Sequence, residues 1–266
     1  MFTGSKAKRV LFQLIPYSKV KDWRVHEGFD FITILADGRA FRFPKNNESA
    51  QKIKIEKKLL NYLRGKMDLL VPNYQKQVKY GPDNYIEIVG QEFTPCFYRK
   101  LSHKQKTEIC RKLARFIKKI HSITLPKSLA AQMSIDNWSK ILRQLKKDIS
   151  HYFESESFFE EFLLLFTKFT NEKRNSCLVH GDLSGDNIIV DYNKKKLVGV
   201  IDFGDVRFSD PAVDFAQFWE FGEKFVTDIV GFYTKDCQAR TKILEASNLY
   251  YCYIMLSMMI IKKKIS

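Results

Sequence analysis

The chain has 266 residues, of which 45% are hydrophobic, and a formal net charge of +15. This length allows a substantial buried core, in one large domain or in two lobes. The charge alone would suggest nucleic acid or an anionic surface as a partner. It is unevenly placed, however, because residues 178–236 hold 11 acidic against 6 basic side chains, a net charge of −5. That segment favours a cationic ligand, although carboxylates needed for catalysis and helix capping would raise the same count.

Neither the cysteines nor the N-terminus indicates secretion. The five cysteines show no C-x-x-C or other metal-binding spacing. The first residues are followed by Lys6, Lys8 and Arg9 rather than by an apolar stretch. The apolar run Leu244–Ile261 is too short, and too polar at its start, to predict a membrane span. We therefore expect a cytoplasmic protein with reduced thiols and no membrane association.

The N-terminal third predicts an antiparallel sheet with one helix. Lys21–Arg39 reads as two strands with a tight turn between them, followed by a third strand at Arg39–Pro44. A helix is predicted over Asn46–Lys66, capped by Asn47 or Ser49.

Two further strands complete this sheet in the prediction. One starts in the segment V-P-N-Y at Val71, and the other is Tyr85–Val89. The expected sheet therefore has five strands within residues 1–90. The alternation of R-A-F-R-F-P places Arg42 on the opposite side of its strand from Phe41 and Phe43.

Helices dominate the rest of the predicted chain. Leu101–Ile123 is amphipathic and Ser102 can cap it. The other predicted helices are Ile135–Ser150, Ser155–Thr170, Pro211–Phe221 and Glu223–Phe232. Between the second and third of these, the apolar runs Asn187–Val190 and Leu197–Ile201 flank a polar hairpin.

Polar side chains at the ends of that hairpin form a two-part pattern. Asp182 lies five residues before Asn187, and Asp202 follows 15 residues later, within I-D-F-G. Together with His180 they match the protein-kinase pattern H-R-D-x-x-x-x-N followed by D-F-G. In that chemistry a carboxylate orients the attacking hydroxyl, and an amide and a second carboxylate bind Mg²⁺. We therefore predict Asp182 as the catalytic residue and Asn187 and Asp202 as Mg²⁺ ligands.

The details differ from protein kinases. Gly181 stands where they have Arg, and Ser184 stands where they have Lys. H-G-D-L-S-x-x-N and I-D-F-G-D…D-P-A-x-D-F-A resemble the aminoglycoside phosphotransferase family of small-molecule kinases. The resemblance extends from about Arg24 to at least Phe221. It implies an α+β, bilobal, kinase-like fold: a nucleotide-binding sheet lobe (residues 1–90), a hinge (91–95) and a helical lobe (96–266).

The resemblance also implies roles for individual residues. Arg42 would hold nucleotide phosphates, with Lys45 as the alternative cation, and Glu56 would pair with it, with Glu48 as the alternative. His180 and Asp214 would support the catalytic loop. The remaining nucleotide contacts would come from the turn at Gly28 and from the hinge residues Gln91, Glu92, Phe93 and Thr94.

The expected donor is ATP or GTP with Mg²⁺, and the expected substrate is a small cationic molecule, an aminoglycoside in the first instance. Its charge would be met by Asp205, Glu220 and Glu223. The same scaffold also serves choline, homoserine and macrolides, and fold alone does not choose among them. A non-catalytic protein that binds nucleotide or RNA is a further alternative, although the intact Asp182, Asn187 and Asp202 set argues against it. We expect a monomer.

Overall fold

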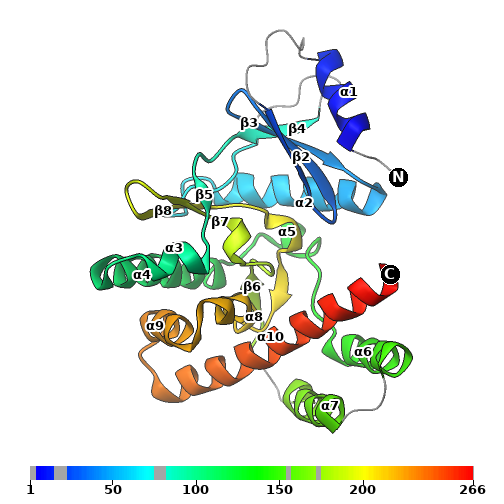
Figure 1. Ribbon diagram of the computed structural model, residues 1–266, viewed down its shortest axis with the longest axis vertical. Helices are drawn as coiled ribbons and strands as arrows, with labels where there is room; N and C mark the ends of the chain where they lie inside the picture. Colours follow the sequence, from blue (N-terminus) through cyan, green and yellow to red (C-terminus); the bar gives the residue numbers. More distant parts are fainter. Residues whose placement is uncertain (1–3, 15–22, 75–81, 154–156, 172–174, 266) are drawn as a thin grey trace. The chain divides into compact units, whose positions relative to one another are not determined.

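The computed structural model describes residues 4–14, 23–74, 82–153, 157–171 and 175–265 (Figure 1). The chain forms two compact units. The first unit comprises Met1–Phe97, Leu125–Gln132 and Gly185–Asp205, and the second comprises Tyr98–Thr124, Met133–Ser184 and Val206–Ser266. The chain therefore passes from the second unit into the first between Ser184 and Gly185, within the predicted catalytic motif. The division into lobes at residues 90 and 96 stays a prediction.

The first unit is built on a four-stranded antiparallel sheet in the order β1-β2-β3-β4. Its strands are β1 (Trp23–Glu27), β2 (Phe31–Ala36), β3 (Arg39–Pro44) and β4 (Asp83–Ile86). The fifth strand expected at Val71 is not present in the described residues, where only an isolated bridge joins Tyr74 to Tyr85. Pro72 has no N–H to donate to a neighbouring strand, and residues 75–81 lie outside the described part of the chain.

Helices α1 (Gly4–Leu14) and α2 (Asn47–Leu63) lie on opposite faces of this sheet (Figure 1). Residues Ala7 and Leu11 of α1 are buried in a cluster with Ile34, Phe41 and Phe43. The alternation of β3 then directs Arg42 towards α2, as predicted. Helix α1 lies in a segment for which the sequence supported no prediction.

The N-cap of α2 is Asn46, whose side chain accepts a hydrogen bond from the Ser49 backbone N–H at 2.8 Å. The prediction of Asn47 or Ser49 as the cap was therefore wrong by one residue or more. Asn46 has the extended backbone that an N-cap requires, and Ser49 is the residue whose N–H it satisfies.

A second sheet in the first unit carries the predicted hairpin. It has the order β5-β7-β8, from β5 (Gln91–Glu92), β7 (Ile188–Asp191) and β8 (Lys196–Val200). Short helical turns flank the hairpin at η2 (Gly185–Asn187) and η3 (Phe203–Asp205). The short helices α3 (Pro95–Arg99) and α5 (Lys127–Ala130) complete the elements with residues in this unit.

The second unit is mainly helical, with one two-stranded sheet of β6 (Cys177–Val179) and β9 (Arg207–Ser209). Its helical elements are α4 (His103–His121), α6 (Trp138–Tyr152), α7 (Ser157–Asn171), α8 (Val213–Ala216), η4 (Gln217–Phe221), α9 (Glu223–Tyr233) and α10 (Cys237–Ile265). Ser102 forms the predicted cap of α4, as part of a complete capping box. Helix α6 begins at Trp138 rather than at Ile135, because the Asp136 N–H donates to the Phe208 carbonyl.

Aromatic side chains fill the core of the second unit. Phe166 of α7 is fully buried and packs against Trp138 of α6 and against Tyr250 and Tyr253 of α10. Helix α10 extends beyond the apolar run Leu244–Ile261 that is predicted to be too short for a membrane span, and by length and composition alone it is a candidate span in the described chain. Its buried residues, among them Tyr250, belong to the core of the second unit, but only 28% of the candidate span is buried.

Candidate active site

In the first unit, Arg42 of β3 is buried between two acidic side chains. Its Nη1 donates to both oxygens of Glu56, at 3.1 and 3.2 Å, and its Nη2 donates to Asp202 Oδ1 at 3.0 Å. The guanidinium carbon lies 4.0 Å from the centre of the Phe31 ring. The side chain is only 3% exposed, so Arg42 does not lie on a solvated face. The predicted pair of a strand cation and a helix carboxylate is therefore present.

Burial and the neighbouring charges shift the pKa values of Arg42 and Glu56. Burial lowers the pKa of Arg42, but the Glu56 and Asp202 carboxylates outweigh it and raise that pKa well above its usual value. Burial raises the pKa of Glu56 to about 7, against the opposing effect of Arg42. Breaking a buried pair by removing one partner costs about 3–5 kcal/mol, because the other charge is left uncompensated.

Asn187 and Asp202 are brought to the same end of the β7–β8 hairpin. Asn187 ends η2, and its carbonyl accepts a hydrogen bond of 2.9 Å from the N–H of Ile201, the residue before Asp202. One carboxamide and one carboxylate are hard oxygen donors that suit Mg²⁺, which completes its coordination with water and phosphates. The described residues contain no cluster of three or more His, Cys, Asp or Glu side chains suited to a metal. The two-residue set fits Mg²⁺ shared with a nucleotide better than a metal held by protein alone.

The backbone at Asp202 is strained. Its φ of 60° is left-handed, a conformation that costs a residue with a Cβ about 1–2 kcal/mol. Such strain is concentrated at functional sites, where the surrounding structure enforces it. Gly204 contributes to this arrangement, because a Cβ there would lie 3.3 Å from Asp202 Oδ1.

In the second unit, Asp182 is partly exposed and is held by a residue that the sequence did not single out. Gln217 of η4 donates from Nε2 to Asp182 Oδ1 at 2.6 Å. The amide donates only through its nitrogen, so this bond fixes the position of Asp182 Oδ1. The orientation of the Asp182 carboxylate is thereby defined.

The loop before Asp182 is held by the buried carboxylate of Asp214. Its oxygens accept hydrogen bonds from the backbone N–H groups of His180 at 2.9 Å and Gly181 at 2.8 Å. Gly181 has a φ of 84°, which explains why glycine replaces the Arg of protein kinases here. The expected support by Asp214 is therefore present in the geometry.

His121 completes this arrangement. Its Nε2 lies 3.0 Å from Asp214 Oδ2, and its Nδ1 lies 3.0 Å from the Tyr233 hydroxyl. Burial would raise the pKa of Asp214, but its hydrogen bonds and the two nearby histidines lower it. The ionised carboxylate can only accept, so Nε2 carries the proton that it donates. His121 therefore holds the Asp214 carboxylate in place.

The segment predicted as the hinge has some of its backbone groups already engaged. The Phe93 N–H donates to the carbonyls of Ile188 at 2.9 Å and Gly185 at 3.1 Å. The Glu92 carbonyl accepts from the Tyr192 hydroxyl at 3.1 Å. The Phe93 N–H is therefore already used, whereas the Glu92 carbonyl keeps a second lone pair that a nucleobase could use. Gln91, Glu92 and Thr94 are exposed or partly exposed, whereas Phe93 is buried.

The carboxylates predicted to bind a cationic substrate differ in their surroundings. Asp205 belongs to the first unit and forms an ion pair of 3.1 Å with Lys52, and its role in substrate binding stays a prediction. Glu220 and Glu223 are exposed in the second unit.

The turn that contains Gly28 is closed by a 2.9 Å hydrogen bond from the Gly28 N–H to the Phe31 carbonyl.

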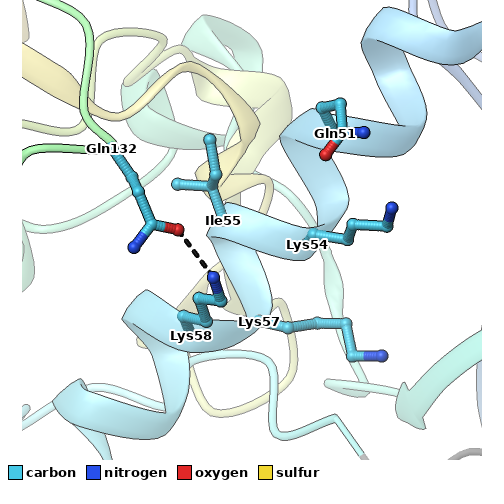
Figure 2. Close-up of a pocket in the computed structure, with 6 residues that line it drawn as sticks. All are labelled: Gln51, Lys54, Ile55, Lys57, Lys58 and Gln132. Atoms are coloured by element: carbon cyan, nitrogen blue, oxygen red, sulfur yellow. Dashed lines mark hydrogen bonds between the residues drawn. The ribbon is translucent and has the colours of Figure 1, made fainter. Parts of the chain in front are cut away.

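A shallow pocket of about 490 Å³ in the first unit lies away from these residues, on the outer face of α2 (Figure 2). Three lysines line it, and Lys58 donates to Gln132 Oε1 at 2.6 Å. Arg42 and Glu56, which are predicted to position nucleotide phosphates, do not line it.

A sheet with a strand cation paired to a helix carboxylate, followed by H-G-D-x-x-x-x-N and D-F-G, defines a kinase-like phosphotransferase. The sequence model of the phosphotransferase enzyme family matches this chain over residues 24–243. The chain belongs to that family.

Solved structures share the whole fold. The GDP complex of wild-type aminoglycoside 2′-phosphotransferase-IIIa matches with a TM-score of 0.80 at 23% identity, over 95% of this chain and 89% of that one. The gentamicin complex of APH(2″)-IIa matches with a TM-score of 0.78 at 24% identity, over 99% and 92%. Macrolide 2′-phosphotransferase type I matches with a TM-score of 0.68 at 19% identity, over 99% and 94%. The kinase-like fold is confirmed.

The raised pKa of Glu56 predicts an unusual dependence of stability on pH. The folded protein, with a pKa of about 7 for this group, binds a proton that the unfolded chain releases near its ordinary pKa of 4.5. The free energy of unfolding should therefore fall as pH rises from about 4.5 to 7, by up to about 3 kcal/mol from this group.

Glu56→Gln should remove that part of the slope, because glutamine does not titrate. Urea unfolding of the nucleotide-free protein at several pH values measures it. Glu48→Gln, at an exposed position in the first turn of the same helix, is the matched control. Equal pH slopes for wild type and Glu56→Gln would contradict the prediction.

Proposed function

We propose that the protein is a nucleotide-dependent kinase that transfers the γ-phosphate of ATP or GTP to a hydroxyl group of a small cationic molecule, an aminoglycoside in the first instance. The observation that carries the reaction is the assembled Arg42–Glu56–Asp202 cluster, together with an Asp182 that Gln217 orients. Buried charges held in this way are expected where phosphates must be positioned, since phosphoryl transfer is catalysed mainly by positioning and charge neutralisation.

In this mechanism Asp182 accepts a hydrogen bond from the substrate hydroxyl and directs its oxygen towards the γ-phosphorus. The new P–O bond forms as the bond to the bridging oxygen breaks, and the nucleoside diphosphate leaves. The hydroxyl proton passes to Asp182 late, so the orientation of this carboxylate matters more than its basicity.

Arg42 would bind the nucleotide phosphates, and Glu56 keeps its guanidinium in place. Arginine suits this position because its fork can bind one acidic group on each edge. Asn187 and Asp202 would hold Mg²⁺, which neutralises charge on the phosphates. Gly28 and the segment Gln91–Thr94 are proposed to contact the phosphates and the base, respectively.

The comparisons support the aminoglycoside assignment without deciding it. The aminoglycoside phosphotransferases match with TM-scores of 0.76–0.82, above the 0.64 and 0.68 of two macrolide phosphotransferases. The structures of the aminoglycoside phosphotransferases are complexes with GDP, ADP, ATP, kanamycin, gentamicin or streptomycin. A macrolide or another hydroxyl compound is the second candidate.

Asp182→Asn should lower turnover by about 10²–10⁴-fold, the usual contribution of a positioned base. Nucleotide affinity, measured by calorimetry, should change little, because the predicted nucleotide contacts lie elsewhere. Asp186→Asn is the matched control, since this aspartate of the same motif is exposed and has no assigned role. Turnover of Asp182→Asn at half the wild-type rate would remove Asp182 from the mechanism.

Asp202→Asn should flatten the Mg²⁺ dependence of nucleotide affinity. Asparagine tolerates the left-handed backbone and can still accept the Arg42 hydrogen bond, so the change tests the negative charge rather than the fold. Calorimetric titration with nucleotide at a series of Mg²⁺ concentrations measures the effect, with Asp186→Asn as the control. A Mg²⁺ response equal to that of the wild type would mean that the metal is bound elsewhere.

Substrate choice is tested with a turnover panel of kanamycin, gentamicin, choline, homoserine and a macrolide at low and high salt. The polycationic compounds should be phosphorylated, with KM rising steeply with salt. Local carboxylates dominate their binding, because the Debye length is about 8 Å at physiological ionic strength and distant lysines are screened.

Glu220→Gln and Glu223→Gln should each raise the KM for a polycationic substrate modestly, since exposed pairs contribute about 0–1 kcal/mol. Turnover of homoserine alone, which carries no net charge, would exclude the cationic substrate, and RNA binding without turnover of any compound would favour the non-catalytic alternative.

A further inference from the structure

Helix α2 makes its acidic and basic contacts from one face. Lys52 and Glu56 are four residues apart, so their side chains lie one turn from each other on the same side of the helix. Glu56 binds Arg42 and also accepts a hydrogen bond from the backbone N–H of Phe203. The helix therefore contacts the turn that follows Asp202, and Lys52 extends these contacts.

Lys52 bridges two carboxylates from separate parts of the first unit. Its Nζ lies 2.6 Å from Asp30 Oδ2 and 3.1 Å from Asp205 Oδ1. The two carboxylates raise the pKa of Lys52 despite its partial burial, so the bridging group is an ammonium ion. Two acidic groups close to one atom would repel each other without a cation between them.

Asp30 fixes the turn between β1 and β2, the turn that contains Gly28. Besides Lys52, its carboxylate lies 3.0 Å from the Ser49 hydroxyl in the first turn of α2, which shares its one proton between Asp30 and the N-cap Asn46. Ser49 is fully buried, so this contact is shielded from water. The Gly28 turn is thus attached to α2 at two side chains.

Asp205 fixes the other end of the bridge. It ends η3, three residues after the proposed metal ligand Asp202, whose backbone is strained. Holding η3 at Phe203 through Glu56 and at Asp205 through Lys52 constrains the chain that immediately follows Asp202.

We propose that Lys52 is a positioning residue for the nucleotide. It ties the Gly28 turn, which would cover the phosphates, to the Asp202 turn, which would hold the metal. Asp205 accordingly serves the nucleotide end of the reaction rather than the cation of the substrate. This inference rests on the proposed function, because it assigns both turns to the same nucleotide.

Lys52→Met should weaken the affinity for the Mg²⁺–nucleotide complex about threefold to tenfold, because the Gly28 turn and the Asp202 turn are then no longer joined through one cation. The KM for the acceptor should stay near its wild-type value. Lys52→Arg should restore most of the affinity, because it keeps a cation that can reach both carboxylates. Calorimetry measures binding independently of turnover.

Lys54→Met is the matched control. Lys54 lies on the opposite, outer face of α2, where Figure 2 shows it pointing away from Gln132 at the edge of the pocket. It is exposed, and the same apolar side chain replaces the same cation there. The control should bind nucleotide as the wild type does.

Asp205→Asn provides the second test, since it keeps the shape of the side chain. If Lys52 acts through Asp205, the double variant Lys52→Met/Asp205→Asn should bind nucleotide no more weakly than Lys52→Met, because coupled positions are not additive. A higher acceptor KM in Asp205→Asn, with unchanged nucleotide affinity, would overturn the inference and return Asp205 to the substrate. Unchanged nucleotide affinity in Lys52→Met would also overturn it. A wild-type protein that binds no Mg²⁺–nucleotide would instead refute the proposed function, and the inference with it.

Discussion

The charge of Arg42 is the constraint on which the first unit depends. A guanidinium that is 3% exposed must have groups of opposite charge beside it, because burial of an unpaired ion is prohibitively costly. Its partners come from α2 and from the end of the β7–β8 hairpin, segments separated by more than a hundred residues of chain. The sheet, the helix and the hairpin must therefore be correctly placed before any of the three charges is stabilised. The same arrangement leaves Asp202 partly exposed, which its proposed role as a metal ligand requires.

The second unit also buries a charged side chain, but different groups stabilise it. Asp214 is buried too, but it is satisfied by two backbone N–H groups and by His121 rather than by a strong cation. A carboxylate that accepts several hydrogen bonds stays ionised, and this one fixes the backbone immediately before Asp182. Loop position is thus set by Asp214, and side-chain orientation by Gln217. The two functions of holding the loop and aiming the carboxylate are carried by residues three positions apart on consecutive helical turns.

Features that depend on residues close in the sequence could be predicted from the sequence. The alternation in β3 placed Arg42 opposite Phe41 and Phe43, and the hairpin placed Asn187 near Asp202, because periodicity and turn chemistry act within a few residues. Lys52 and Gln217 were missed for the opposite reason. Their partners Asp205 and Asp182 are distant in sequence, and an isolated lysine or glutamine on a helix is usually solvated. Helix α1 was also missed, since its pattern has meaning only against the sheet it covers.

Net charge counted along a sequence overstates the charge that a ligand meets. The acidic segment 178–236 has a net charge of −5, yet Asp205 is paired with Lys52 and Asp214 is buried with His121. Outside that segment, Asp136 is bound by Arg207. These carboxylates are committed to holding the protein together, so the attraction for a cation falls to exposed groups such as Glu220 and Glu223. Since each exposed pair contributes little, a cationic ligand would be held by several weak polar contacts acting together.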